Sequence, residues 1–150
     1  MPYTSRETLL SRGEAAFHGP LQEAVGGQYL IMCKVRVADV LTCTDADWRR
    51  GHGGAISQKH LDFVLCEPAS TRIVLAIELD DRSHEAEHRR RRDLFLNEAL
   101  EVAGVRLLRV KARSNYSAAI IRTLLDAAIG RSFPAESSIP ATSHEHAPTP

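Results

Sequence analysis

Carboxylates gather at the end of an apolar stretch in the middle of the chain. The stretch covers residues 72–84, and its polar end contains Glu78, Asp80 and Asp81, followed by Arg82 and His84. Successive side chains of a β-strand alternate between its faces, so Glu78 and Asp80 are predicted to project from the same face. The opposite face of this strand is predicted to be apolar and to comprise Ile73, Leu75, Ile77 and Leu79. Two neighbouring carboxylates repel each other unless a cation lies between them, so the pair is a candidate site for a hard metal ion.

Another acid, Asp62, lies in an upstream apolar stretch that covers residues 59–66. Its neighbours at alternate positions are predicted to form one apolar face, made of Leu61, Phe63 and Leu65. An acid in the middle of a strand is unfavourable unless it has a partner. The turn-like segment 67–71 separates the two stretches, which predicts an antiparallel hairpin with Asp62 beside Glu78.

A simpler interpretation gives these acids no chemical role. Aspartate is common in turns, so Glu78, Asp80 and Asp81 are also consistent with a strand that ends in a solvated loop. The three acids alone do not distinguish the two interpretations. Asp62 favours the metal site, because a hairpin would bring together acids from two strands.

Composition limits the class of protein. A chain of 150 residues with 43% hydrophobic content is expected to form a single domain with its own core. No apolar run approaches the length of a membrane span and no signal-peptide pattern is present, so we expect a cytoplasmic protein that does not enter a membrane. The three cysteines have no Cys-x-x-Cys spacing and are expected to be reduced. Because the formal net charge is zero, affinity for nucleic acid would have to come from local basic patches.

Hydrophobic periodicity predicts the order of the elements. The predicted elements are a helix over 6–25, a strand over 29–40, the two strands of the hairpin, a helix over 85–103, a strand over 105–112 and a helix over 116–129. Residues 130–150 are rich in Ser, Pro, Thr, Ala and His, which predicts a disordered tail after a domain over 1–129. Residues 41–59 are predicted to form a long loop. In that loop, Trp48 beside two arginines suggests stacking on a nucleic-acid base, but we favour packing of the loop onto the core.

The acid-bearing stretches and two later segments together resemble a known family. The segments are 59–66, 77–81 with Ser83 and His84, 92–96 and 104–110. They resemble the domain-of-unknown-function (DUF) family 2726, which is similar to very-short-patch-repair-like endonucleases. The element order is similar to that of the PD-(D/E)XK nuclease superfamily. The resemblance covers roughly residues 9–113. It implies an α/β fold with a three-layer restriction-endonuclease-like core of order αβββαβ(α), in which helices flank a mixed central sheet.

The resemblance also implies a set of metal ligands. It places Asp62 and Glu78 on Mg²⁺ or Mn²⁺, and Glu14 where some members supply an acid from the first helix. Asp80 departs from the superfamily pattern, which has a lysine that orients the attacking water and stabilises the phosphate. An acid can instead act as a general base or hold a second cation. The missing positive charge must then come from another residue, and the candidates are Lys59, Arg82, His84, Arg109 and Lys111.

The leading expectation is a Mg²⁺-dependent nuclease that hydrolyses phosphodiester bonds of DNA. In this hypothesis Asp80 activates water, and His84 orients that water or protonates the leaving oxygen. The residues expected to bind nucleic acid are Lys59, Arg92, Arg109 and Lys111. The first alternative is a catalytically inactive nuclease-fold module that binds nucleic acid. The second is a metal-dependent hydrolase of a small phosphorylated substrate.

Overall fold

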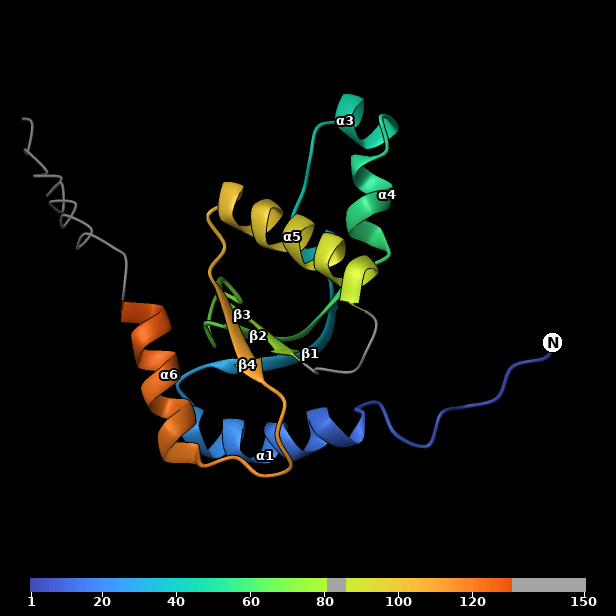
Figure 1. The fold of residues 1–150 in the computed structure, drawn as a ribbon. Coiled ribbons are helices and arrows are strands. Elements are labelled where there is room, and N and C mark those ends of the chain that lie inside the picture. The colour runs from blue at the N-terminus through green and yellow to red at the C-terminus, as the bar shows by residue number, and fades with distance from the viewer. Residues whose placement is uncertain (81–85, 131–150) are drawn as a thin grey trace, which may run out of the picture.

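A mixed four-stranded sheet forms the centre of the protein, with helices on both of its faces (Figure 1). The structure is a computed structural model that describes residues 1–80 and 86–130, without the side chains of residues 86–93. The strands are β1 (Leu30–Arg36), β2 (His60–Cys66), β3 (Ile73–Asp80) and β4 (Leu107–Lys111). The helices are α1 (Arg12–Val25), α2 (Val37–Val40), α3 (Asp45–Arg49), α4 (His52–Ser57), α5 (Ala86–Val102) and α6 (Ala118–Gly130).

The strands are arranged in the order β1-β2-β3-β4. The first two pairs are antiparallel, which confirms the predicted hairpin of β2 and β3. The β3–β4 pair is parallel, and α5 provides the crossover that parallel strands require. The predicted order of the long elements is therefore confirmed, as is a mixed sheet flanked by helices.

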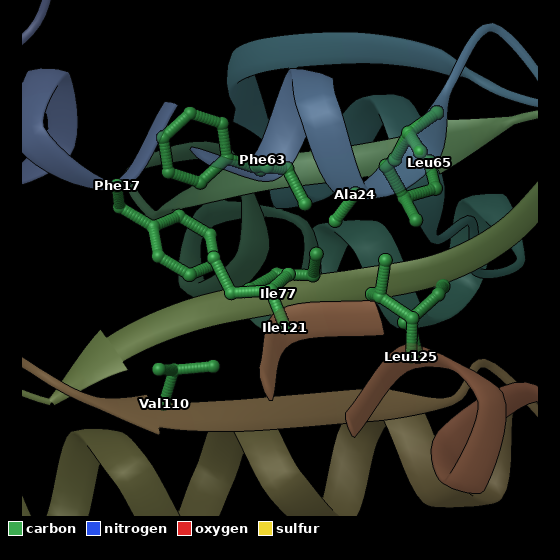
Figure 2. Close-up of a cluster of buried hydrophobic side chains, with 11 residues drawn as sticks. Phe17, Ala24, Phe63, Leu65, Ile77, Val110, Ile121 and Leu125 are labelled. Atoms are coloured by element: carbon green, nitrogen blue, oxygen red, sulfur yellow. The ribbon is translucent and has the colours of Figure 1, made fainter. Parts of the chain in front are cut away.

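Both faces of the sheet are buried, each against its own hydrophobic cluster. On one face, side chains of α1 and α6 pack against the strands, and the rings of Phe17 and Phe63 lie 5.5 Å apart (Figure 2). On the other face, α2, α4 and α5 cover the sheet, with Leu61 and Leu100 fully buried. Each such side chain contributes roughly 1.5–3 kcal/mol when it is removed from water. Burial on both faces explains why β2 is a nearly continuous apolar run after its exposed first residue, His60, with Asp62 as the polar residue within it.

Helix α1 begins later than predicted, at Arg12 rather than Arg6. Ser11 fixes the start: its hydroxyl accepts a hydrogen bond from the Glu14 N–H at 3.3 Å, and the Glu14 carboxylate accepts one from the Ser11 N–H at 2.8 Å. This reciprocal pair is a capping box. Gly26 ends the helix in the left-handed conformation with φ 58°, where a residue without Cβ is favoured.

The long loop predicted over residues 41–59 is wrong, because the segment contains α3 and α4. Thr44 caps α3 by accepting a hydrogen bond from the Asp47 N–H. The ring of Trp48 then lies directly on Gly53 of α4, so close that a Cβ at Gly53 would be 2.1 Å from a ring atom. Trp48 therefore packs within this helical pair, and its side chain remains partly exposed.

Some strand positions face the opposite side from the one that simple alternation predicts. A register shift between Leu65 and Cys66 turns Ile73 to the α5 face, and Leu61 also lies on that face. In β1, Cys33 packs with the α1 cluster whereas Val35 packs with the α5 cluster. The predicted strand over 29–40 also ends early, because α2 begins at Val37.

Other predictions concern compartment and chain ends. Cys33, Cys43 and Cys66 are free, as expected for reduced cysteines. Within residues 1–80 and 86–130, no helix combines the length and the apolar character needed to cross a membrane. The tail predicted over 130–150 lies outside the described residues except for Gly130, the last residue of α6.

Candidate active site

Each of the four strands contributes one charged residue at the same level of the sheet. The β1–β2 pairs on either side place Lys34 opposite Asp62. The β2–β3 register, continued by one residue, places Asp62 opposite Glu78, and Glu78 pairs directly with Arg109 of β4. We call these four residues the charged row. Its two central members are acids and its two outer members are cations, so the acids are flanked by positive charge on both sides.

Asp62 joins β2 to β3 through its side chain. Its Oδ2 accepts a hydrogen bond from the backbone N–H of Leu79 at 2.8 Å, so a carboxylate replaces the backbone carbonyl that would continue the ladder. Burial raises the pKa of Asp62, and the nearby Glu14 carboxylate raises it further, although the Leu79 N–H opposes both effects. Asp62 is therefore fixed in direction and costly to ionise without a cation nearby.

Glu78 is a buried acid with a strongly raised pKa. Its Oε1 is buried and has no hydrogen-bond partner among the described residues. Burial raises the pKa of Glu78 to about 7, with a further contribution from the negative charge of Asp62. A buried carboxylate oxygen without a donor requires either a proton or a cation. Glu78 is therefore a group on which either a proton or a cation could be held.

Asp80 and Asn97 hold Arg109 beside Glu78. The Nη1 of Arg109 donates to Asp80 Oδ1 at 2.6 Å. Its Nε and Nη2 both donate to the Asn97 side-chain oxygen, at 3.1 and 3.0 Å. These bonds connect β4 to β3 and α5, and they fix the guanidinium at the end of the charged row.

Glu14 holds the cation at the other end of the row. Lys34 Nζ lies 2.5 Å from Glu14 Oε1, while the second carboxylate oxygen accepts the Ser11 N–H. Burial alone would raise the pKa of Glu14, but the ammonium of Lys34 and the Ser11 N–H outweigh that effect and lower the pKa. The carboxylate also lies close enough to Asp62 to raise the pKa of that residue. The first helix thus reaches the site through Glu14.

The structure brings together five of the residues predicted from the sequence. They are Glu14, Asp62, Glu78, Asp80 and Arg109. Sequence reasoning missed Lys34 on β1 and Asn97 on α5. Lys34 is recognisable as part of the site only when the register of β1 against β2 is known.

The remaining predicted residues lie elsewhere or outside the described part of the chain. Lys59 is engaged within the protein, since its Nζ donates to the Ala55 carbonyl at 2.9 Å and lies 4.8 Å from the centre of the Phe95 ring. Lys111 is exposed at the end of β4, where it pairs in register with Asp80 at the edge of the site. Residues Arg82 and His84 and the side chain of Arg92 lie outside the described residues.

The described side chains offer a metal ion few ligands. No group of three or more His, Cys, Asp or Glu side chains within this part of the chain is arranged to hold a metal ion. Asp62 and Glu78, which lie opposite each other in the continued β2–β3 register, are the two acids predicted to bind the ion. Mg²⁺ is commonly bound by one or two carboxylates and completes its octahedron with water and substrate phosphate oxygens. A two-carboxylate site is consistent with that mode of binding.

A comparison with protein-family models matches residues 6–129, and the matching family is described as "Protein of unknown function (DUF2726)". The chain belongs to this family. The match to DUF2726 covers all four strands and every member of the charged row. Searches of the curated proteins and of the solved structures found no match. The chemistry of the site therefore provides the basis for a functional proposal.

Proposed function

We propose that this DUF2726 domain is a Mg²⁺- or Mn²⁺-dependent phosphodiesterase that hydrolyses nucleic acid, with DNA as the expected substrate. The buried, unpartnered Oε1 of Glu78 beside a second acid carries the proposal. A divalent cation bound there would polarise the phosphate and lower the pKa of a bound water. The αβββαβα order of the long elements supports relating the domain to PD-(D/E)XK nucleases with a restriction-endonuclease-like core.

Asp62 and Glu78 are the proposed ligands of the ion. The Leu79 N–H fixes the Asp62 carboxylate, so this ligand is already oriented in the folded protein. Glu78 lies opposite Asp62 and is the acid that gains most from a cation, because its raised pKa reflects burial near another negative charge. The predicted place of Glu14 on the metal remains a prediction, since its two oxygens already accept hydrogen bonds from Lys34 and Ser11.

Arg109 supplies a positive charge that the superfamily usually takes from a lysine. The guanidinium pairs in register with Glu78 and is fixed by Asp80 and Asn97. A guanidinium stays positively charged at every relevant pH, so it can supply the charge that faces a phosphate. Asp80 is therefore proposed to position Arg109, which accounts for an acid where the superfamily has a lysine. The expected roles of Asp80 as a base and of His84 toward the water remain predictions.

A second candidate function is a module of the same fold that binds nucleic acid without cutting it. The two-carboxylate site favours this candidate, because the described residues supply no third acid free of other partners. The two candidates differ in one observable, which is metal-dependent cleavage.

Plasmid cleavage tests the proposal. Supercoiled DNA is incubated with the full chain and Mg²⁺ or Mn²⁺, and wild type is compared with Glu78→Gln and with Glu98→Gln, a control at an exposed position of α5. Wild type and the control should nick the plasmid, whereas Glu78→Gln should lose about 10²-fold or more in rate because a metal ligand is removed. Equal cleavage by wild type and Glu78→Gln would disprove the assignment. If the wild type binds DNA and RNA but cleaves neither with either metal, the binding module replaces the phosphodiesterase.

A further inference from the structure

The backbone of Lys34 adopts an unusual conformation in the middle of a strand. Its φ is 55°, in the left-handed region that residues with a Cβ seldom adopt. Thr71, the other such residue in the described part of the chain, lies in the turn between β2 and β3, where a positive φ is ordinary. No turn explains Lys34. Strain of this kind inside a regular element is typical of functional sites.

The unusual backbone redirects the Lys34 side chain. The flanking residues Cys33 and Val35 pack on opposite faces of the sheet. Lys34 therefore lies at the point where the alternation of side chains along β1 is interrupted. The side chain reaches Glu14 on α1, with 2.5 Å between Nζ and Oε1, and its charge also acts on Asp62. The strain therefore places an ammonium beside the candidate metal ligands.

The capping of α1 does not explain this ion pair. Glu14 completes the capping box by accepting the Ser11 N–H through its other oxygen, Oε2. The Lys34 side chain remains 34% exposed, against 10% for Glu14, so the ammonium lies between a buried acid and solvent. A lysine ammonium has three donors, and its bond to Glu14 uses one of them. Its other donors are suited to an anion that approaches from the open side.

We infer that Lys34 is a second catalytic cation, which Glu14 holds so that the ammonium donates to the phosphate oxygens of the substrate in the transition state. This inference rests on the phosphodiesterase function proposed above. It assigns Lys34 to the β1 end of the charged row and Arg109 to the β4 end, so that positive charge faces the phosphate from both sides of the acid pair. Glu14 is then a positioning residue.

The test compares Lys34→Met with Arg36→Met, an exposed control on the same strand whose ion pair with Asp39 lies outside the site. Lys34→Met should lower kcat about 10²–10³-fold, the usual effect of losing one donor to a developing oxyanion. Affinity for Mn²⁺, measured by calorimetry without substrate, should stay unchanged or increase, because a cation near the metal ligands is gone. Binding of a DNA duplex in Ca²⁺ should become less dependent on salt, by about one counterion. Arg36→Met should change none of these quantities.

A double variant separates catalysis from charge balance. Lys34→Met alone leaves Glu14 without its counter-ion, which is expected to destabilise the fold, so Glu14→Gln/Lys34→Met removes both charges. Our inference expects the double variant to fold and to cleave as slowly as expected for Lys34→Met. Recovery of cleavage in the double variant would show that Lys34 only neutralises Glu14, and weaker Mn²⁺ binding by Lys34→Met would also overturn the inference. Absence of cleavage by wild type would overturn this inference together with the proposed function. Recovered cleavage in the double variant, or weaker Mn²⁺ binding by Lys34→Met, would overturn the assignment of Lys34 alone.

Discussion

Glu78 links the stability of the fold to pH. Burial and the neighbouring Asp62 raise its pKa in the folded state from 4.5 to about 7. The protonated Glu78 carboxyl is therefore favoured in the folded protein more than in the unfolded chain. The stability that comes from this proton is fully present below pH 4.5 and is lost as the pH rises to about 7. The loss is on the order of 3 kcal/mol of the free energy of unfolding. The protein keeps this acid at a cost to its own stability, as a functional group would require.

Replacing Glu78 with glutamine should stabilise the metal-free protein in a pH-dependent way. Glu78→Gln has no charge to desolvate, so its free energy of unfolding should exceed that of wild type by about 3 kcal/mol at pH 8 and by almost nothing at pH 4.5. Urea unfolding in EDTA at the two pH values measures the difference, with Glu98→Gln as the exposed control. A parallel pH dependence in wild type and Glu78→Gln would show that Glu78 does not titrate as described.

At the residue scale, the sequence was informative where strand alternation held. The placement of Asp62 beside Glu78 followed from a hairpin and a period of two, and the structure has that hairpin. Lys34 and Asn97 could not be found in this way. The side chain of Lys34 is redirected by a positive φ, and Asn97 reaches Arg109 from α5, the helix that directly precedes β4. Neither property is visible in hydrophobic periodicity.

At the element scale, the segment from residue 41 to residue 59 was the main failure of sequence reasoning. Gly51, Gly53 and Gly54 suggest a loop, since glycine disfavours helix. Contacts specific to this segment outweigh that tendency. The Trp48 ring packs directly against Gly53 of α4, where a Cβ would collide with it. This glycine is therefore required by packing rather than by flexibility. Short helices of this kind depend on tertiary contacts, which local propensity does not reveal.

Adjacent glycines in α4 should therefore respond oppositely to alanine. In Gly53→Ala the new Cβ would meet Trp48 ring atoms at 2.1–2.6 Å, so the ring must move, at about 1–3 kcal/mol of stability. In Gly54→Ala the Cβ meets nothing within 4 Å, and stability should rise by about 0.4–1 kcal/mol. Thermal unfolding measures both effects, and the fluorescence of the single tryptophan should change in Gly53→Ala alone. Equal stabilisation by both substitutions would contradict the packing of Trp48.

At the scale of the whole molecule, the order of the long elements was predictable because apolar periodicity is strong in the buried strands, whereas the mixed sheet was implied by the family resemblance. The sheet is covered on both faces, by α1 and α6 on one and by α5 on the other (Figure 1). Charged groups at the sheet are thus costly, and the charged row stands out for that reason. With a formal net charge of zero, the protein has no global field to attract nucleic acid, so the proposed attraction is local to the row.

Titration of the full chain with Mn²⁺ tests the central claim, that the acid pair of Asp62 and Glu78 is completed by a divalent cation. Calorimetry in buffers of different ionisation enthalpy gives both the affinity and the number of protons released on binding. Because the pKa of Glu78 is about 7, we predict release of close to one proton at pH 6 and of about one-tenth of a proton at pH 8, with binding lost in Glu78→Gln. Binding that is the same in Glu78→Gln, or that releases as many protons at pH 8 as at pH 6, would contradict the claim.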